Sequence, residues 1–250
     1  MQAAHKLILK MADDALVTGH RNSEWTGLGP ILEEDIAFSS MAQDKIGHAL
    51  ALYTILQEHG GMEDPDQLAF MRKPKDFRCC HFTELPIGEY DFSLVRHFLF
   101  DHAEAIRYEL LAASTCEPLA RLARKVKGEL KYHVLHANSW ILRLGNGTEV
   151  SHARMQSSLN FAMPYALGMF EETDEEQELM SENIFPGESR LREFWDEHIR
   201  EQLVKANLAF PDVKADEVHF GGRKGFHTEH LHQLLEEMTQ VFKLEESVAW

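Results

Sequence analysis

Apolar residues recur at alternating spacings of three and four along four long segments, and this pattern constrains the fold more than any other feature of the chain. It predicts helices over residues 3–24, 33–58, 92–113 and 118–144. Such spacing gives each helix an apolar face, and these faces are buried when the helices pack against one another. Chain breakers stand where the helices should end, at Gly29-Pro30, Gly60-Gly61 and Gly145-Asn146-Gly147.

The connection between the second and third helices, residues 62–90, is long and contains several prolines. We expect it to be irregular, with at most a short helix around Gln67–Met71. Two long helices, a long crossover and two further long helices are typical of the ferritin-like four-helix bundle.

The second half of the chain predicts shorter helices, at about residues 151–171, 189–208 and 227–243. No segment alternates in the manner of a β-strand and no repeat is present, so the predicted fold class is all-α. We expect a single ferritin-like domain over residues 1–250. Its core bundle would span about 3–145, and a C-terminal helical extension would span about 151–250.

Charge and cysteine usage narrow the possible functions. The formal net charge of −16 argues against nucleic acid as a partner, because phosphate contacts require a basic surface. The three cysteines, Cys79, Cys80 and Cys116, show no Cys-x-x-Cys spacing, which favours reduced thiols in a cytoplasmic protein. No run of about 18 apolar residues occurs and no signal-peptide pattern opens the chain, so we expect no membrane association.

A few polar residues interrupt the apolar faces near the middle of the four long helices. They are Asp14 in the first, Lys45 and His48 in the second, Asp101 in the third and His133 in the fourth. If the four faces meet, these side chains converge at a similar depth. Burying an unpaired charge is costly, so the set predicts either a self-satisfied polar core or a metal site, intact or vestigial.

A carboxylate-bridged di-iron site in such a bundle needs a Glu-x-x-His pair from each of two helices. Here the two histidines, His48 and His133, are preceded at that spacing by Lys45 and Leu130, so both glutamates are missing. A leucine offers no lone pair and an ammonium group repels a cation. Asp44 and Glu129 lie one residue before the lost positions and could replace them only if the backbone shifted.

The sequence therefore predicts a vestigial metal site in which Lys45 pairs with Asp14 and Asp101 in place of a metal. Its positions are Asp14, Lys45, His48, Asp101, Leu130 and His133. No catalytic residue and no metal ligand are expected in this chain. The alternative is a metal-binding ferritin-like oxidoreductase with a residual site at Asp101, His48 and His133.

Several motifs resemble those of one known family, the ferritin-like structural subunit of bacterial phenylacetyl-CoA epoxidase, also called phenylacetate-CoA oxygenase. The most specific are Leu144-Gly145-Asn146-Gly147-Thr148 and the stretch from Gly221 to Leu231, Gly-Gly-Arg-Lys-Gly-Phe-His-Thr-Glu-His-Leu. Further matches are Glu24-Trp25, Leu32-Glu33-Glu34-Asp35-Ile36-Ala37, Ala42-Gln43-Asp44-Lys45-Ile46-Gly47-His48-Ala49, Leu68-Ala69-Phe70 and Tyr132-His133. The resemblance covers roughly residues 5–250.

The resemblance implies a non-catalytic subunit of an oxygenase that epoxidises the ring of phenylacetyl-CoA in aerobic phenylacetate breakdown. It implies that the di-iron cofactor and the substrate belong to a related subunit, that this chain packs against it, and that homo- and hetero-oligomers form. A separate flavin and iron–sulfur reductase would supply electrons. No cofactor is then expected in this chain.

The glycine-rich segment Gly221–Gly225 has two interpretations. Arg223 and Lys224, with His227 nearby, could lie at a subunit interface or near the phosphates of CoA. The simpler interpretation is a turn before a helix that Thr228 caps. The acidic run at 171–178 is interpreted as a solvated helix end or loop.

Overall fold

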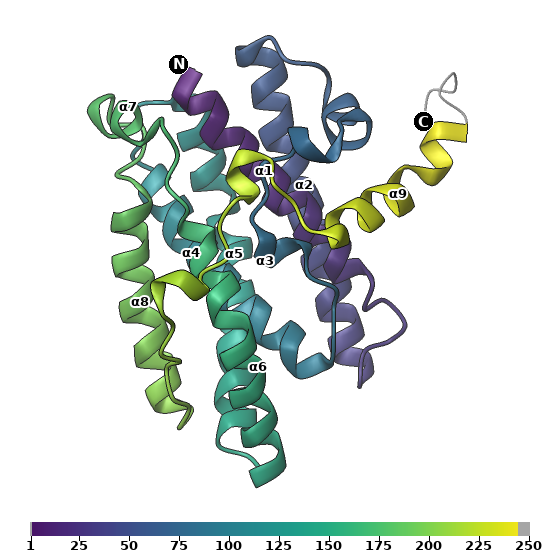
Figure 1. Cartoon of the computed structure of the whole chain (residues 1–250), viewed down its shortest axis with the longest axis vertical. Coiled ribbons are helices and arrows are strands. Elements are labelled where there is room, and N and C mark those ends of the chain that lie inside the picture. Colours follow the sequence, from purple (N-terminus) through teal and green to yellow (C-terminus); the bar gives the residue numbers. More distant parts are fainter. Residues whose placement is uncertain (1, 245–250) are drawn as a thin grey trace.

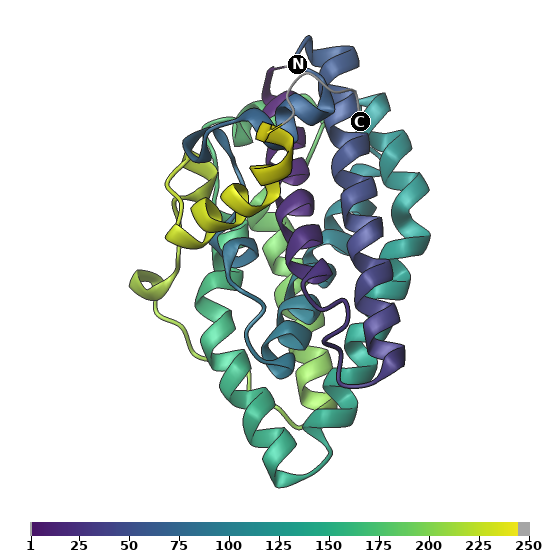
Figure 2. The same ribbon diagram turned by 90° about the vertical axis from the view of Figure 1, so that its right-hand side faces the viewer.

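Four long helices form the bundle in the computed structural model, which describes residues 2–244 (Figures 1 and 2). They are α1 (Gln2–Ser23), α2 (Leu32–Gly60), α4 (Tyr90–Leu111) and α5 (Glu117–Gly145). Helix α1 packs along α2, α4 packs along α5, and α2 also contacts α5. No strand occurs within residues 2–244. The predicted all-α fold class and helical bundle are confirmed, and all four helices lie close to their predicted boundaries.

Local signals explain where these helices begin and end. Gly61 ends α2 in the left-handed conformation, with φ of 63°, and its N–H donates to the carbonyl of Leu56. Pro118 occupies the first turn of α5, where a backbone N–H would have no acceptor within the helix, so the lack of one in proline costs nothing. Helix α6 (Glu149–Leu167) starts at a capping box formed by Thr148 and Ser151.

The crossover between α2 and α4 holds three short helical pieces. They are the π-helical turn η1 (Gln67–Met71), the 3-10 turn η2 (Pro74–Asp76) and helix α3 (His81–Glu84). Residues 67–71 are helical as predicted, whereas the other two pieces were not anticipated. Helix α3 packs against α1 and also touches α6 and α9, so the crossover is part of the packed body.

The second half of the chain wraps the α4 side of the bundle. Helices α6 and α8 (Glu188–Lys205) both pack against α4, and Trp195 of α8 donates from Nε1 to the carbonyl of Leu99, 2.8 Å away. The remaining pieces are η3 (Gly168–Phe170), α7 (Glu176–Ser181), η4 (Ala215–Glu217), η5 (Gly222–Lys224) and α9 (Glu229–Leu244). The last part of the predicted extension, residues 245–250, lies outside the described residues.

The apolar faces predicted from the sequence are buried in the bundle. At their centres Phe38, Leu52, Phe98, Leu130 and Ala137 are at most 1% exposed. Polar residues on the same faces are buried as deeply, so each needs a hydrogen-bonding or ionic partner inside the bundle. Within residues 2–244, no helix combines the length and hydropathy needed to cross a bilayer.

Candidate functional site in the bundle core

A lysine lies at the centre of the bundle with two carboxylates around it. Lys45 of α2 is fully buried, its Nζ is 2.7 Å from Oδ1 of Asp101, and it also pairs with Glu104. Both acids come from α4, one helical turn apart, so they reach Lys45 from the same face. Burial alone would lower the pKa of Lys45, but the two carboxylates outweigh it and the pKa is raised.

His97 completes this group, which we call the Lys45 cluster (Lys45, His97, Asp101 and Glu104). Its Nδ1–H donates to Oδ2 of Asp101 at 2.8 Å, one turn along α4. Burial lowers the pKa of His97 more than Asp101 raises it, which favours the neutral ring. Burial would raise the pKa of Asp101, but Lys45 and then His97 hold it far below its usual range. The cluster therefore contains one cation and at least one firmly ionised carboxylate.

The two predicted histidines point toward carboxylates on each other's helix. His48 of α2 donates from Nε2 to Oε2 of Glu129 on α5 at 2.7 Å. His133 of α5 donates from Nε2 to Oδ2 of Asp44 on α2 at 3.0 Å. Asp44 and Glu129 are thus engaged without any backbone shift, as partners of the histidines. These reciprocal pairs join α2 to α5 within one helical turn of Lys45 and Leu130.

Asp14 lies away from the Lys45 cluster, and its expected pairing with Lys45 is wrong. Its Oδ1 accepts the backbone N–H of Cys80 at 2.9 Å, and its Oδ2 lies 2.7 Å from Arg223. This face of α1 meets α3 and the segment around η5, which the sequence pattern did not place against it. Leu130 is buried as an ordinary apolar core residue.

These residues do not fit a carboxylate-bridged di-iron centre. An ammonium group occupies the space between Asp101 and Glu104, and a leucine stands where a chelating carboxylate is required. The three residues of the alternative metal site, Asp101, His48 and His133, are also not gathered around one point. Among residues 2–244, the ligand atoms of Asp101, His48 and His133 do not all come within 4.8 Å of one another.

Sequence reasoning missed Glu104 and His97, although a signal for both was present. Glu104 follows Asp101 by three residues and His97 precedes it by four, so all three side chains lie on one face of α4. The sequence pattern predicts a single apolar stripe for this helix. Because α5, α6 and α8 all pack against α4, it buries several faces at once, and polar residues outside the stripe are buried too.

A second buried acid that the sequence did not reveal fixes the start of α2. The carboxylate of Glu34 accepts Nε1–H of Trp140 at 2.8 Å and Nε2–H of His136 at 2.9 Å, both from α5. It also accepts the hydroxyl of Tyr90 from α4. One side chain thereby connects α2, α4 and α5.

The glycine-rich loop binds a carboxylate of its own chain. The backbone N–H of Gly221 donates to Oε2 of Glu171 at 2.8 Å, the N–H of Arg223 also points to it at 3.4 Å, and Lys224 lies 3.7 Å from Oε1. The guanidinium of Arg223 is buried against Asp14 and the carbonyl of Met169. The amides that could have held a phosphate are therefore already engaged.

The other residues of this region also differ from expectation. His227 is buried against Glu84, so of Arg223, Lys224 and His227 only Lys224 is exposed. Thr228 stands directly before α9, where a capping residue is expected, and its hydroxyl donates to Glu84. The acidic run is not simply solvated, because Glu171 is buried and α7 begins within the run.

Comparison with known proteins agrees with this architecture. The whole chain, residues 1–250, matches the family described as phenylacetic acid catabolic protein. Over 242 residues the chain is 31% identical to the C component of 1,2-phenylacetyl-CoA epoxidase from Escherichia coli (strain K12), covering 97% of each chain. The chain belongs to the phenylacetic acid catabolic protein family.

Proposed function

We propose that this chain is a structural subunit of a multicomponent phenylacetyl-CoA epoxidase and supports a catalytic di-iron subunit without performing the chemistry. The observation that carries the proposal is the Lys45 cluster, in which a salt bridge occupies the centre of a bundle built like a di-iron protein. The C component of the Escherichia coli epoxidase is similar over nearly its whole length, which supports the assignment to such a complex.

A structural subunit needs a surface for its partner, and α2 and α5 provide one. Each helix exposes a stripe of uncharged residues at alternating spacings of four and three. The stripes consist of Ile36, Ser40, Gln43, Gly47 and Leu50 on α2, and Gly128, Tyr132, Leu135, Ser139 and Leu142 on α5. We call these two stripes the α2–α5 face. They belong to neighbouring helices, which the His48–Glu129 and His133–Asp44 pairs join.

The pattern of the α2–α5 face suits packing against helices of another subunit. Residues spaced three and four apart form one stripe on a helix surface, and such a stripe can pack knobs-into-holes against a helix of another subunit. Both stripes lack charge although the formal net charge of the chain is −16. A Cβ added at Gly47 or Gly128 would meet nothing within 4 Å, so at these points another backbone can approach closely. We propose the catalytic subunit, itself a related helical bundle, as the partner.

The binding test uses purified partner and single substitutions on the face. Leu135 is 63% exposed, and Leu135→Asp should place a charge in the interface and weaken binding at least tenfold, since one apolar anchor contributes about 1.5–3 kcal/mol. Val204→Asp on α8 is the matched control, because Val204 is more exposed and lies outside the face. Calorimetry of each variant with the catalytic subunit measures the affinity. Equal affinity of the Leu135→Asp variant and wild type would refute the α2–α5 face as the docking surface.

The non-catalytic assignment has its own test. The chain should be purified alone and with its partner, and iron should be measured in each preparation. We expect iron and epoxidation of phenylacetyl-CoA to follow the partner subunit, and we expect His48→Gln and His133→Gln to leave the iron content of each preparation unchanged. Oxygen consumption by the chain alone that is lost in these two variants would overturn the proposal.

A further inference from the structure

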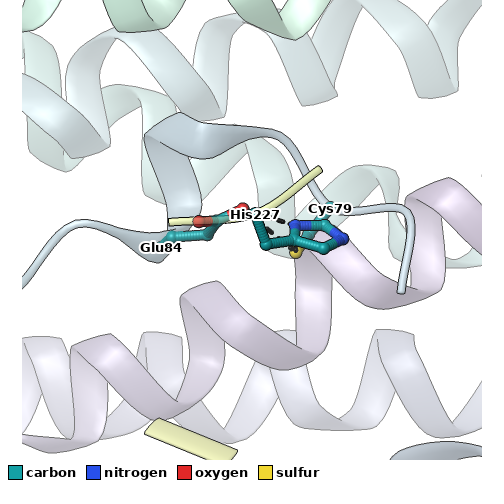
Figure 3. Close-up of side chains that lie close together, drawn as sticks. All are labelled: Cys79, Glu84 and His227. Carbon is teal, nitrogen blue, oxygen red and sulfur yellow. Dashed lines mark hydrogen bonds and ion pairs between the residues drawn. The ribbon is translucent and has the colours of Figure 1, made fainter. Parts of the chain in front are cut away.

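Three side chains with metal-ligating atoms, two from the crossover and one from the residues just before α9, lie close together in the structure (Figure 3). Cys79 precedes α3, Glu84 ends α3, and His227 lies just before α9. Sγ of Cys79 is 3.9 Å from both Oε1 of Glu84 and Nδ1 of His227, and these last two atoms are 2.7 Å apart. The side chains of Glu84 and His227 are at most 1% exposed. This group takes no part in the proposed structural function.

The hydrogen bonds of His227 determine what can lie between it and Glu84. Nε2 is 3.0 Å from the carbonyl of Phe77, which can only accept, so Nε2 carries a hydrogen. In a neutral ring Nδ1 then presents a lone pair. That lone pair would face a carboxylate oxygen at 2.7 Å, which is repulsive. Either a proton, carried by the ring or by the carboxyl group, or a metal ion must therefore occupy the gap.

The surroundings orient each ligand atom toward the same point. Oε2 of Glu84 accepts the N–H and the hydroxyl of Thr228, at 2.8 and 2.6 Å, which leaves Oε1 for the gap. The Phe77 carbonyl fixes the ring of His227 with Nδ1 inward, as a backbone carbonyl commonly does for a metal-bound histidine. Cys79 has no exposed surface, and burial raises the pKa of its thiol.

We propose that Cys79, Glu84 and His227 form a binding site for one divalent transition-metal ion of the zinc class, held by Sγ, Oε1 and Nδ1 with a water as fourth ligand. Thiolate, imidazole and carboxylate are the ligand types that zinc takes in proteins. On binding, the ion displaces the thiol proton and the proton between His227 and Glu84, and both protons leave to solvent. The buried group is then neutral before and after, so the ion adds no uncompensated charge.

The observed distances need small adjustments to accommodate the ion. With bond lengths of about 2.0–2.3 Å and tetrahedral angles, an N···O separation of about 3.3 Å and S···N or S···O separations of about 3.6 Å are required. The His227–Glu84 gap must therefore open from 2.7 Å, and the sulfur must approach from 3.9 Å. The gap must widen by about 0.6 Å and the sulfur must approach by about 0.3 Å, changes that side-chain rotation can supply.

The consequence of binding would be to fasten α9 to the bundle. Within the described residues, α9 packs chiefly against η1, η2 and α3. Two of the ligands belong to α3 and the chain directly before it, and the third to the residues leading into α9. A bound ion would thus cross-link the crossover to the residues that lead into the C-terminal helix α9.

Cobalt(II) titration of the full-length chain, after removal of metal with a chelator, tests the site directly. We expect one ion per chain, a thiolate-to-cobalt absorption band in the near ultraviolet, and the visible bands of tetrahedral cobalt. Cys79→Ser should abolish the ultraviolet band and weaken binding at least tenfold. Cys80→Ser is the matched control, because Cys80 is the adjacent buried cysteine and lies outside the group.

Wild-type protein alone supplies a second test, so a poorly folding variant does not leave the question open. Zinc at about 100 times its Kd should raise the Tm over that of the chelator-treated chain by about 5–10 °C. Hydrogen exchange should slow in α9 and α3 more than elsewhere. Failure of cobalt and zinc to bind wild type would overturn the proposal and leave a proton between His227 and Glu84. An unchanged sulfur–cobalt band in the Cys79→Ser variant would overturn it equally.

Discussion

Replacing Lys45 by methionine tests whether the ammonium group neutralises the buried carboxylates at the centre of the bundle. Methionine is close to lysine in length, so Lys45→Met removes the charge while leaving little cavity. Asp101 and Glu104, which are fully and almost fully buried, would lose their cation. Removing one partner of a buried ion pair costs about 3–5 kcal/mol, and we expect the lower end because His97 still donates to Asp101. A loss of about 3 kcal/mol lowers the Tm of a chain of this size by about 6–12 °C.

The pH dependence of this loss follows from the charges. In the wild type the pKa of Asp101 is held far below its usual range, so its contribution to stability is present above about pH 4 and declines only in stronger acid. Without Lys45, burial raises the pKa of the same carboxyl, and protonation relieves the penalty as the pH falls. The difference in Tm between variant and wild type should therefore shrink from pH 7 to pH 5.

Thermal unfolding followed by circular dichroism at pH 7, 6 and 5 measures this effect. A triple variant, Lys45→Met with Asp101→Asn and Glu104→Gln, is the control, because it removes the unpaired charges as well. It should recover much of the lost stability at pH 7. An unchanged Tm for Lys45→Met, or a loss that is the same at each pH and not recovered in the triple variant, would refute this reasoning.

Other buried charges and close approaches give further predictions. Glu188 is fully buried and pairs with Lys10 at 2.7 Å; burial would raise its pKa, but nearby cations lower it to about 2. Glu188→Gln should cost about 3–5 kcal/mol at pH 7 in urea unfolding, and the wild-type contribution should be lost as the pH falls from about 4.5 to 2. Gly222→Ala should cost about 1–3 kcal/mol, because its Cβ would lie 2.2 Å from the carbonyl oxygen of Cys79. Gly128→Ala, in open space, should stabilise the isolated chain by about 0.5–1 kcal/mol yet weaken partner binding in calorimetry.

The sequence was sufficient for the bundle because each long helix has to bury an apolar face. The central residues of the predicted stripes, Met41 and Phe98 among them, are fully buried. Those stripes also located Lys45 and Asp101 correctly as interior polar residues, and the two do pair. The periodicity of apolar residues indicates which face of a helix is buried, and it does so even when the helices that cover this face are unknown.

The sequence could not assign the partners of those faces, and this explains the misplaced Asp14. Its carboxylate is buried as predicted, but against Cys80 and Arg223, which belong to the crossover and to the loop before α9. Contacts of this kind depend on how irregular segments fold back onto the bundle. Those segments carry no periodic signal, so Glu84 and its contact with His227 were equally hidden.

The His48–Glu129 and His133–Asp44 pairs connect the interior of the bundle to the α2–α5 face. Asp44 and Glu129 retain 28% and 46% of their side-chain exposure, and they lie beside the two uncharged stripes. Covering such carboxylates with a partner would be costly if they were unpaired. Each already accepts a hydrogen bond from a buried histidine, His133 or His48, so docking would not leave either one without a partner. Under the proposed function, His48 and His133 therefore act as hydrogen-bond donors that allow the carboxylates beside the α2–α5 face to be covered by a partner.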